Sequence, residues 1–122
     1  ARLDAHIVNY ADDFVICCRA TATEAAAAME KIMEKLKLKV NEQKTRLCRV
    51  TDESFDFLGY TIGYCHSMKT GKTYIGTRPS KQKVVALCRE ISEMTSRRWL
   101  LLPVQERVYQ MNRKLLGWSN YF

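Results

Sequence analysis

The sequence predicts an α+β fold in which antiparallel hairpins and one helix precede a helical segment. Short runs of β-branched and aromatic residues, separated by turn residues, occupy most of the first two-thirds of the chain. Apolar residues at helical spacing occupy the last third. The boundary is expected at residues 78–81, where Pro79 ends an extended segment and Ser80 is suited to cap a helix. The predicted domains are therefore residues 1–77 and residues 78–122.

The length and composition are typical of a globular protein. A chain of 122 residues fits one ordinary domain, or one small domain with an appendage. Its residues are 47% apolar and 27% charged, and no apolar run approaches the roughly 18–20 residues that span a bilayer, so no membrane partner is expected. The chain begins with Ala1 rather than Met and has no signal pattern, so we expect it to be a piece of a longer protein.

The five cysteines indicate a reducing environment. Their number is odd and none is arranged as C-x-x-C, which argues against both a disulfide framework and a zinc site. The adjacent Cys17 and Cys18 are interpreted as small residues of a strand. A cytoplasmic location is therefore expected.

Positive charge is concentrated near the C-terminus. Residues 1–77 contain 11 Lys and Arg against 10 Asp and Glu, whereas residues 78–122 contain nine against three, a net charge of +6. A basic segment of this kind favours a surface that meets a polyanion such as a phosphate backbone. A solvated helical face explains the charge equally well.

Two adjacent carboxylates, Asp12 and Asp13, lie between two runs of β-branched and aromatic residues, 7–10 and 14–16. The runs predict paired strands, and Asp suits the tight connection between them because it tolerates turn conformations. Neighbouring carboxylates repel one another, and Mg²⁺ removes the repulsion because it binds oxygen ligands. Two such ions, about 3.5–4 Å apart, would activate an attacking hydroxyl and stabilise a leaving phosphate oxygen. An ordinary solvated turn is the alternative for the pair taken alone.

A helix is predicted from Thr21 to about Leu38. Thr21 and Glu24 form a capping-box pattern in which Thr21 is the N-cap. The helix is expected to pack one apolar face against a sheet, with its charged residues directed outward. The apolar face consists of Ala25, Ala28, Met29, Ile32 and Leu36.

Three turn-forming residues organise the chain between this helix and Ser80. Asn41 is expected to connect two short strands within residues 38–48. Gly59 lies inside a strand predicted over residues 55–62, where it indicates a bulge or a close approach by another backbone. Gly71 marks the turn of a second hairpin.

Two helices are predicted in residues 78–122. The first follows Ser80, and the second has Pro103 as its first helical residue and Gly117 as its C-cap. Each has a single apolar stripe, so the pair is expected to need a third partner. About 45 residues are marginal for an independent fold.

Five blocks of the sequence follow one another along the chain: Tyr10 to Asp13, Asn41 to Thr45, Phe57 to Tyr60, Pro79-Ser80 and Gly117 to Phe122. The first resembles the YxDD motif, the second the L-x-L-N-x-x-K-T block with Val40 in place of the second Leu, and the third the F-x-F-L-G-F/Y block of the primer grip. The last resembles the G-W-x-N-Y-F signature of the maturase thumb, or domain X. The five blocks occur in the order found in group II intron-type reverse transcriptase/maturases, which the chain resembles.

The resemblance implies an antiparallel palm-type sheet with a packing helix, followed by a partial helical thumb. It implies that Asp12 and Asp13 are catalytic carboxylates that bind two Mg²⁺ ions, and that Lys44 lies near the incoming triphosphate. A plain surface lysine is the alternative for Lys44. The residues implied to contact nucleic acid are Tyr10 and Ala11 beside the primer terminus, Phe57, Leu58, Gly59 and Tyr60 in the primer grip, and Lys81, Lys83 and Arg89 along the duplex backbone.

The resemblance also implies the function and the partners. The parent protein would be an RNA-directed DNA polymerase that takes an RNA template, a DNA primer, dNTPs and intron RNA. The third metal-binding Asp of such enzymes would precede Ala1, so we expect this chain to be inactive by itself and to self-associate through an exposed sheet edge. The alternative to a polymerase is an RNA-binding maturase module that assists intron splicing. A basic α+β interaction domain is a third hypothesis.

Overall fold

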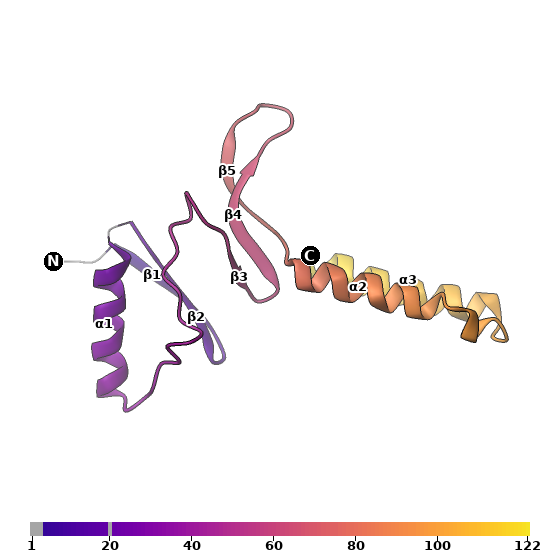
Figure 1. The fold of residues 1–122 in the computed structure, drawn as a ribbon, viewed down its shortest axis with the longest axis horizontal. Helices are drawn as coiled ribbons and strands as arrows, with labels where there is room; N and C mark the ends of the chain where they lie inside the picture. The colour runs from indigo at the N-terminus through magenta and orange to yellow at the C-terminus, as the bar shows by residue number, and fades with distance from the viewer. Residues whose placement is uncertain (1–3, 20) are drawn as a thin grey trace. The chain divides into compact units, whose positions relative to one another are not determined.

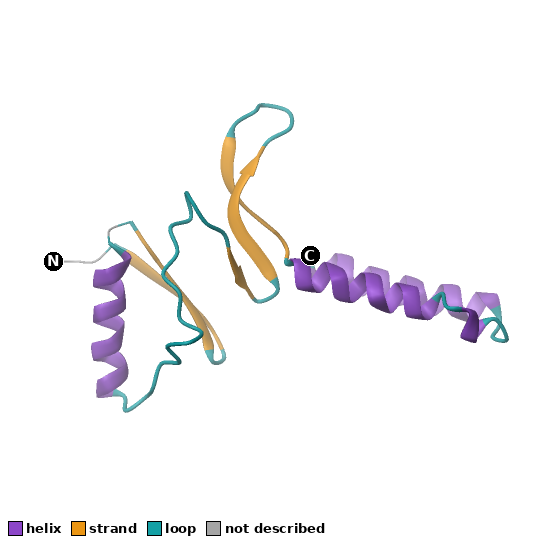
Figure 2. Cartoon of the chain, in the orientation of Figure 1, coloured by secondary structure: helices purple, strands orange, loops and turns teal. Residues whose placement is uncertain are grey.

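The computed structural model describes residues 4–19 and 21–122, which form two compact units, Ala1–Arg49 and Val50–Phe122. The first unit contains two strands and a helix, and the second contains three strands followed by two α-helices and a short 3₁₀ helix (Figures 1 and 2). Both sheets are antiparallel. The predicted α+β class is confirmed.

The first unit is built on a hairpin. Strand β1 (Ala5–Tyr10) pairs with β2 (Asp13–Cys18), in a register that places Tyr10 opposite Asp13. The β-branched and aromatic residues of both strands favour this extended conformation. Helix α1 (Ala22–Lys35) follows and contacts β2, and Ala25 on this helix is buried. The predicted hairpin with the two Asp residues at its tip is confirmed.

Helix α1 differs from the prediction at both ends. Thr21 is the N-cap, but its side chain makes no capping hydrogen bond, so the predicted capping box is wrong. The helix ends at Lys35, before the predicted end near Leu38. The cause is a turn in which Lys37 adopts φ 56° while the N–H groups of Lys37 and Leu38 donate to Glu34 and Met33. This hydrogen-bond pattern closes helices at a residue with positive φ.

Residues 38–48 form a turn without the two strands that were predicted around it, and that prediction is wrong. The Asn41 carbonyl accepts from the N–H groups of Lys44 and Thr45 at 3.1 and 3.0 Å, and its side chain accepts from Gln43 N–H at 3.1 Å. These local bonds satisfy the backbone groups that a sheet would otherwise use. The expected turn at Asn41 is therefore present, and only its flanking strands are not.

The second unit begins with a three-stranded sheet in the order β3 (Phe55–Phe57), β4 (Tyr60–His66) and β5 (Thr73–Pro79). Leu58 and Gly59, with φ 51° and 83°, form the two-residue turn between β3 and β4. Positive φ at both positions is typical of a type I′ turn, which matches the twist of paired strands. The bulge predicted inside one continuous strand is therefore wrong, because Gly59 lies in the turn between β3 and β4. The alternative, a close approach by another backbone, is confirmed, since Ser80 N–H donates to the Gly59 carbonyl at 2.8 Å.

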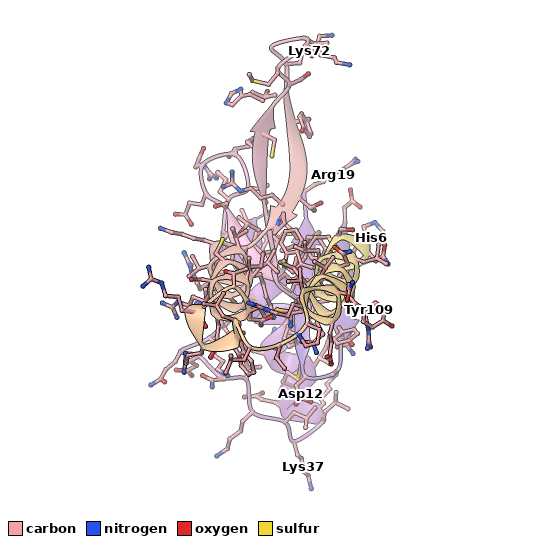
Figure 3. The ribbon with its side chains drawn as sticks, turned by 90° about the vertical axis from the view of Figure 1, so that its right-hand side faces the viewer. His6, Asp12, Arg19, Lys37, Lys72 and Tyr109 are labelled. Atoms are coloured by element: carbon pink, nitrogen blue, oxygen red, sulfur yellow. The ribbon has the colours of Figure 1, made fainter. Side chains whose placement is uncertain are left out.

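Strands β4 and β5 form the second predicted hairpin. Gly71, with φ 66°, lies in its loop, where its N–H donates to Ser67 and the Ser67 N–H donates to Lys72. Lys72 marks this loop in Figure 3. The strand β5 ends at Pro79, as predicted.

Two helices complete the second unit and lie side by side (Figures 1 and 3). The Ser80 hydroxyl caps α2 (Lys81–Met94) by accepting from Lys83 N–H at 3.4 Å, which confirms the predicted cap. A 3₁₀ turn, η1 (Arg97–Trp99), leads to α3 (Val104–Tyr121). Pro103 is the N-cap of α3 rather than its first helical residue.

Gly117 lies inside α3, which continues to Tyr121, so the predicted C-cap at Gly117 is wrong. The residues after Gly117 pack their rings against the β3–β4 hairpin. This packing favours continued helix over the left-handed cap that Gly permits.

Most large apolar side chains of the described residues are exposed. The buried apolar side chain found in the described part of the chain is the small one of Ala25. Ile7 and Val8 of β1, for example, are more than half exposed. Exposed apolar area of this extent is typical of surfaces that meet another part of a protein. None of the helices described is long and apolar enough to cross a membrane.

Candidate functional site

The Asp pair lies at the tip of the first hairpin. Ala11 and Asp12 are the two turn residues, and Asp13 is the first residue of β2. Ala11 has φ 51°, a conformation that costs a non-glycine residue about 1–2 kcal/mol. Both carboxylates are exposed (Asp12 is labelled in Figure 3). The paired strands therefore hold two adjacent negative charges at one rigid and accessible point.

The chemistry of this pair fits Mg²⁺, although two carboxylates do not complete its coordination. Mg²⁺ takes oxygen ligands in octahedral geometry, commonly from one or two carboxylates together with water and substrate phosphates. Within the described residues, no group of three or more His, Cys, Asp or Glu side chains is arranged to hold a metal ion. Asp12 and Asp13 could therefore supply only part of the coordination that Mg²⁺ needs.

Tyr10 and Lys44 are the other predicted site residues in the first unit. Tyr10 pairs with Asp13 across the hairpin and is 65% exposed, so its ring is available beside the two carboxylates. Lys44 lies in the Asn41 turn, where its N–H is bonded to the Asn41 carbonyl and its side chain is exposed. Among the described residues, no hydrogen bond or ion pair joins Lys44 to the Asp pair.

The predicted primer-contacting residues, Phe57 to Tyr60, form the turn and the flanking positions of the β3–β4 hairpin. Both carbonyls of the turn accept hydrogen bonds from outside it: Gly59 from Ser80 N–H at 2.8 Å, and Leu58 from the Tyr121 hydroxyl at 2.9 Å. A hollow of about 390 Å³ lies beside this turn. Its lining residues are Phe57, Leu58, Tyr60, Ile62, Thr77, Tyr121 and Phe122.

The three predicted basic residues of α2 are exposed but do not share one face. At about 100° per residue, Arg89 lies roughly 80° from Lys81 around the helix, whereas Lys83 lies about 160° from it. The methylene groups of Lys83 lie against Gly59, since a Cβ added there would be 3.1 Å from Lys83 Cε. Lys83 of α2 therefore lies against the hairpin turn, whereas Lys81 is on nearly the opposite side of the helix. Arg89 lies closer to Lys81 than to Lys83 around the helix axis.

Sequence reasoning missed the part that the aromatic end of α3 plays in this site. Tyr121 and Phe122 were recognised as a family signature, without a role, and they contact Tyr60 with ring centroids 5.6 and 4.9 Å apart. Trp118 contacts Phe122 at 4.8 Å. The signal available in the sequence was three aromatic residues within five positions at the end of a helix, which favours packing against another element.

A family model for reverse transcriptase (RNA-dependent DNA polymerase) matches residues 1–62, which is half of the chain. The chain therefore belongs to the reverse transcriptase family. Members of this family polymerise DNA on an RNA template, bind a template and a primer, and generally use Mg²⁺. In the same comparisons, no curated protein and no solved structure matches the chain.

The matched span contains several of the predicted site residues. Asp12 and Asp13, Lys44 and the β3–β4 turn all lie within residues 1–62. The helices α2 and α3 lie beyond it. Membership of the family therefore rests on the part of the chain that holds the Asp hairpin.

Proposed function

We propose that this chain is the C-terminal part of the palm and the start of the thumb of a group II intron-type reverse transcriptase. Residues 1–77 would belong to the palm and residues 78–122 to the thumb, or domain X. The proposal is supported by the five ordered sequence blocks, three of which lie within the span matched by the family. The proposed boundary is a functional one and lies inside the second packing unit.

Asp12 and Asp13 carry the proposed chemistry. They would hold Mg²⁺ together with a carboxylate from another part of the protein. The bound metal would activate the primer hydroxyl and stabilise the leaving pyrophosphate. The observation that carries the proposal is the position of two adjacent exposed carboxylates on a rigid hairpin tip, within the span that matches reverse transcriptases.

The remaining residues would bind and orient the substrates. Tyr10 and Ala11 lie at the carboxylates and would form the surface beside the primer terminus. Lys44 would place its cation near the triphosphate, which suits a flexible exposed lysine on a hydrogen-bonded turn. The β3–β4 turn would hold the primer, and the exposed cations of α2 would follow the phosphate backbone. The basic residues concerned are Lys81, Lys83 and Arg89.

The isolated chain is expected to be inactive in primer extension, because a two-metal site needs more ligands than its two carboxylates supply. The measurement is incorporation of labelled dNTP on an RNA template with an annealed DNA primer and Mg²⁺. The longer reverse transcriptase that contains this chain serves as the positive control and is expected to extend the primer. Incorporation of dNTP by the isolated chain would contradict the proposal that this chain lacks a complete metal site. Inactivity of the longer protein would contradict the proposed function.

A maturase role in folding intron RNA is a second candidate, favoured by the net charge of +6 in residues 78–122. If this role stands apart from polymerisation, an Asp12→Ala variant of the longer protein is expected to support intron splicing at nearly the unmodified rate. The measurement is splicing of a precursor RNA with and without the variant. Loss of splicing together with polymerisation would show that the two roles share the Asp site.

A further inference from the structure

The β3–β4 turn is held from two sides by the ends of α2 and α3. Backbone groups in a two-residue turn have no ladder partner of their own and need other partners. Here the Leu58 carbonyl accepts from the Tyr121 hydroxyl at 2.9 Å, and the Gly59 carbonyl accepts from Ser80 N–H at 2.8 Å. Tyr121 is on α3, whose end lies beside the start of α2 (Figure 1).

A second hydrogen bond and several ring contacts join the same elements. The Tyr60 hydroxyl donates to the Tyr121 carbonyl, while the Tyr121 hydroxyl donates to the Leu58 carbonyl, so the hairpin and the end of α3 each donate a hydrogen bond to the other. Their rings stack with an interplanar angle of 25°, and the Phe122 ring contacts both. Aromatic pairs have preferred ring orientations, so contacts of this kind fix the relative orientation of two elements in addition to burying apolar area. Hairpin and helix end therefore form one junction within the second unit.

We propose that Tyr121 is a positioning residue for the primer, acting through the Leu58–Gly59 turn. This inference rests on the proposed function, in which that turn contacts the primer. Leu58 has φ 51°, a conformation that costs a residue with a Cβ about 1–2 kcal/mol, so an outside restraint helps the turn to keep this shape. The Tyr121 hydroxyl supplies that restraint at the Leu58 carbonyl itself.

The expected effect of removing the Tyr121 hydroxyl depends on how exposed its hydrogen bond to the Leu58 carbonyl is. Tyr121 is 55% exposed, so water competes for its hydroxyl and for the Leu58 carbonyl. A neutral hydrogen bond of this type contributes about 1 kcal/mol, which corresponds to about fivefold in a binding constant. The rings remain in contact without the hydroxyl, so the fold should survive its removal.

The test compares Tyr121→Phe with Tyr109→Phe in the longer reverse transcriptase that contains this chain. Tyr109 is on the same helix, is 63% exposed and contacts Arg113 through its ring, and no hydrogen bond from its hydroxyl is found among the described residues (Tyr109 is labelled in Figure 3). For Tyr121→Phe, KM for the primer–template is expected to rise about fivefold, while KM for dNTP changes by less than about twofold. Tyr109→Phe is expected to leave both constants unchanged.

The outcomes separate this inference from the function on which it rests. Normal primer extension with no difference between the two variants would overturn the inference alone. A Tyr121→Phe variant that loses stability and raises both constants equally would also overturn it, because a merely structural residue acts on the whole fold. Failure of the unmodified protein to extend any primer would overturn the proposed function and the inference together.

Discussion

Replacement of Asp12 or Asp13 with asparagine in the longer protein proposed to contain this chain is expected to reduce primer extension by at least about a thousandfold, or about 4 kcal/mol of transition-state stabilisation. Asparagine preserves the size and one oxygen of the side chain but removes the negative charge that would attract Mg²⁺ under the proposed function. Both residues are exposed at the hairpin tip, so the fold should tolerate either change. The measurement is the rate of primer extension on an RNA template.

RNA binding is expected to change little in the same variants. The excess positive charge lies in residues 78–122, away in sequence from the Asp pair, and phosphate contacts dominate affinity for RNA. Binding of the primer–template should therefore stay within about twofold when measured without dNTPs. A loss of binding equal to the loss of extension would indicate that the substitutions disturb the fold rather than the chemistry.

Asp4 provides a matched control at the other end of the hairpin. It forms an exposed ion pair with Arg19 at 3.8 Å, and exposed pairs of this kind contribute little to stability. Asp4→Asn is expected to extend primers at the unmodified rate. If Asp12→Asn behaved like Asp4→Asn, the Asp pair would be an ordinary turn and the proposed site would be wrong.

Substitution of Gly63 with alanine is expected to lower the free energy of unfolding by about 2 kcal/mol. Gly63 is buried in β4, opposite Gly76 of β5. A Cβ at position 63 would be 2.8 Å from the Ser54 Cβ and 3.3 Å from the Ser54 Cα. Backbone as well as side chain would have to move, because an atom at such a distance overlaps its neighbour. Chemical denaturation of the chain measures the change.

Gly117→Ala is the control for this prediction, and its expected effect has the opposite sign. Gly117 lies inside α3, and a Cβ there would meet nothing within 4 Å. Alanine favours helix over glycine by roughly 0.5–1 kcal/mol in such a position, so the variant should unfold at higher denaturant concentration. Equal stability of Gly63→Ala and the unmodified chain would show that the Ser54 loop does not pack against β4 in solution.

The parts of the fold that the sequence predicted correctly depend on neighbouring residues. The hairpin around Asp12 and Asp13 follows from β-branched residues on both sides of a turn, and the cap at Ser80 follows from a serine placed just after proline. The second hairpin follows in the same way from Gly71. Each of these features is decided within a few residues, so local propensity was sufficient.

The wrong predictions concern places where more distant partners, or competing local bonds, decide the outcome. The strands predicted around Asn41 would need a pairing partner, and the turn bonds at Asn41 replace it. The bulge predicted at Gly59 was a question of register, which depends on the pairing of Phe57 with Tyr60. The spacing of apolar residues reveals neither the hydrogen bonds of the Asn41 turn nor the register of the β3–β4 hairpin.

The sequence by itself determined the family of this protein, because the adjacent carboxylates of Asp12 and Asp13 and the blocks that follow them predicted a reverse transcriptase before any fold was known. Tertiary structure decided how the candidate primer-contacting turn is held. Gly117 permits a helix end, yet α3 continues so that Tyr121 reaches the Leu58 carbonyl and its ring stacks on Tyr60. The physical reason is that contacts between residues about 60 positions apart outweigh the weak local preference of one glycine.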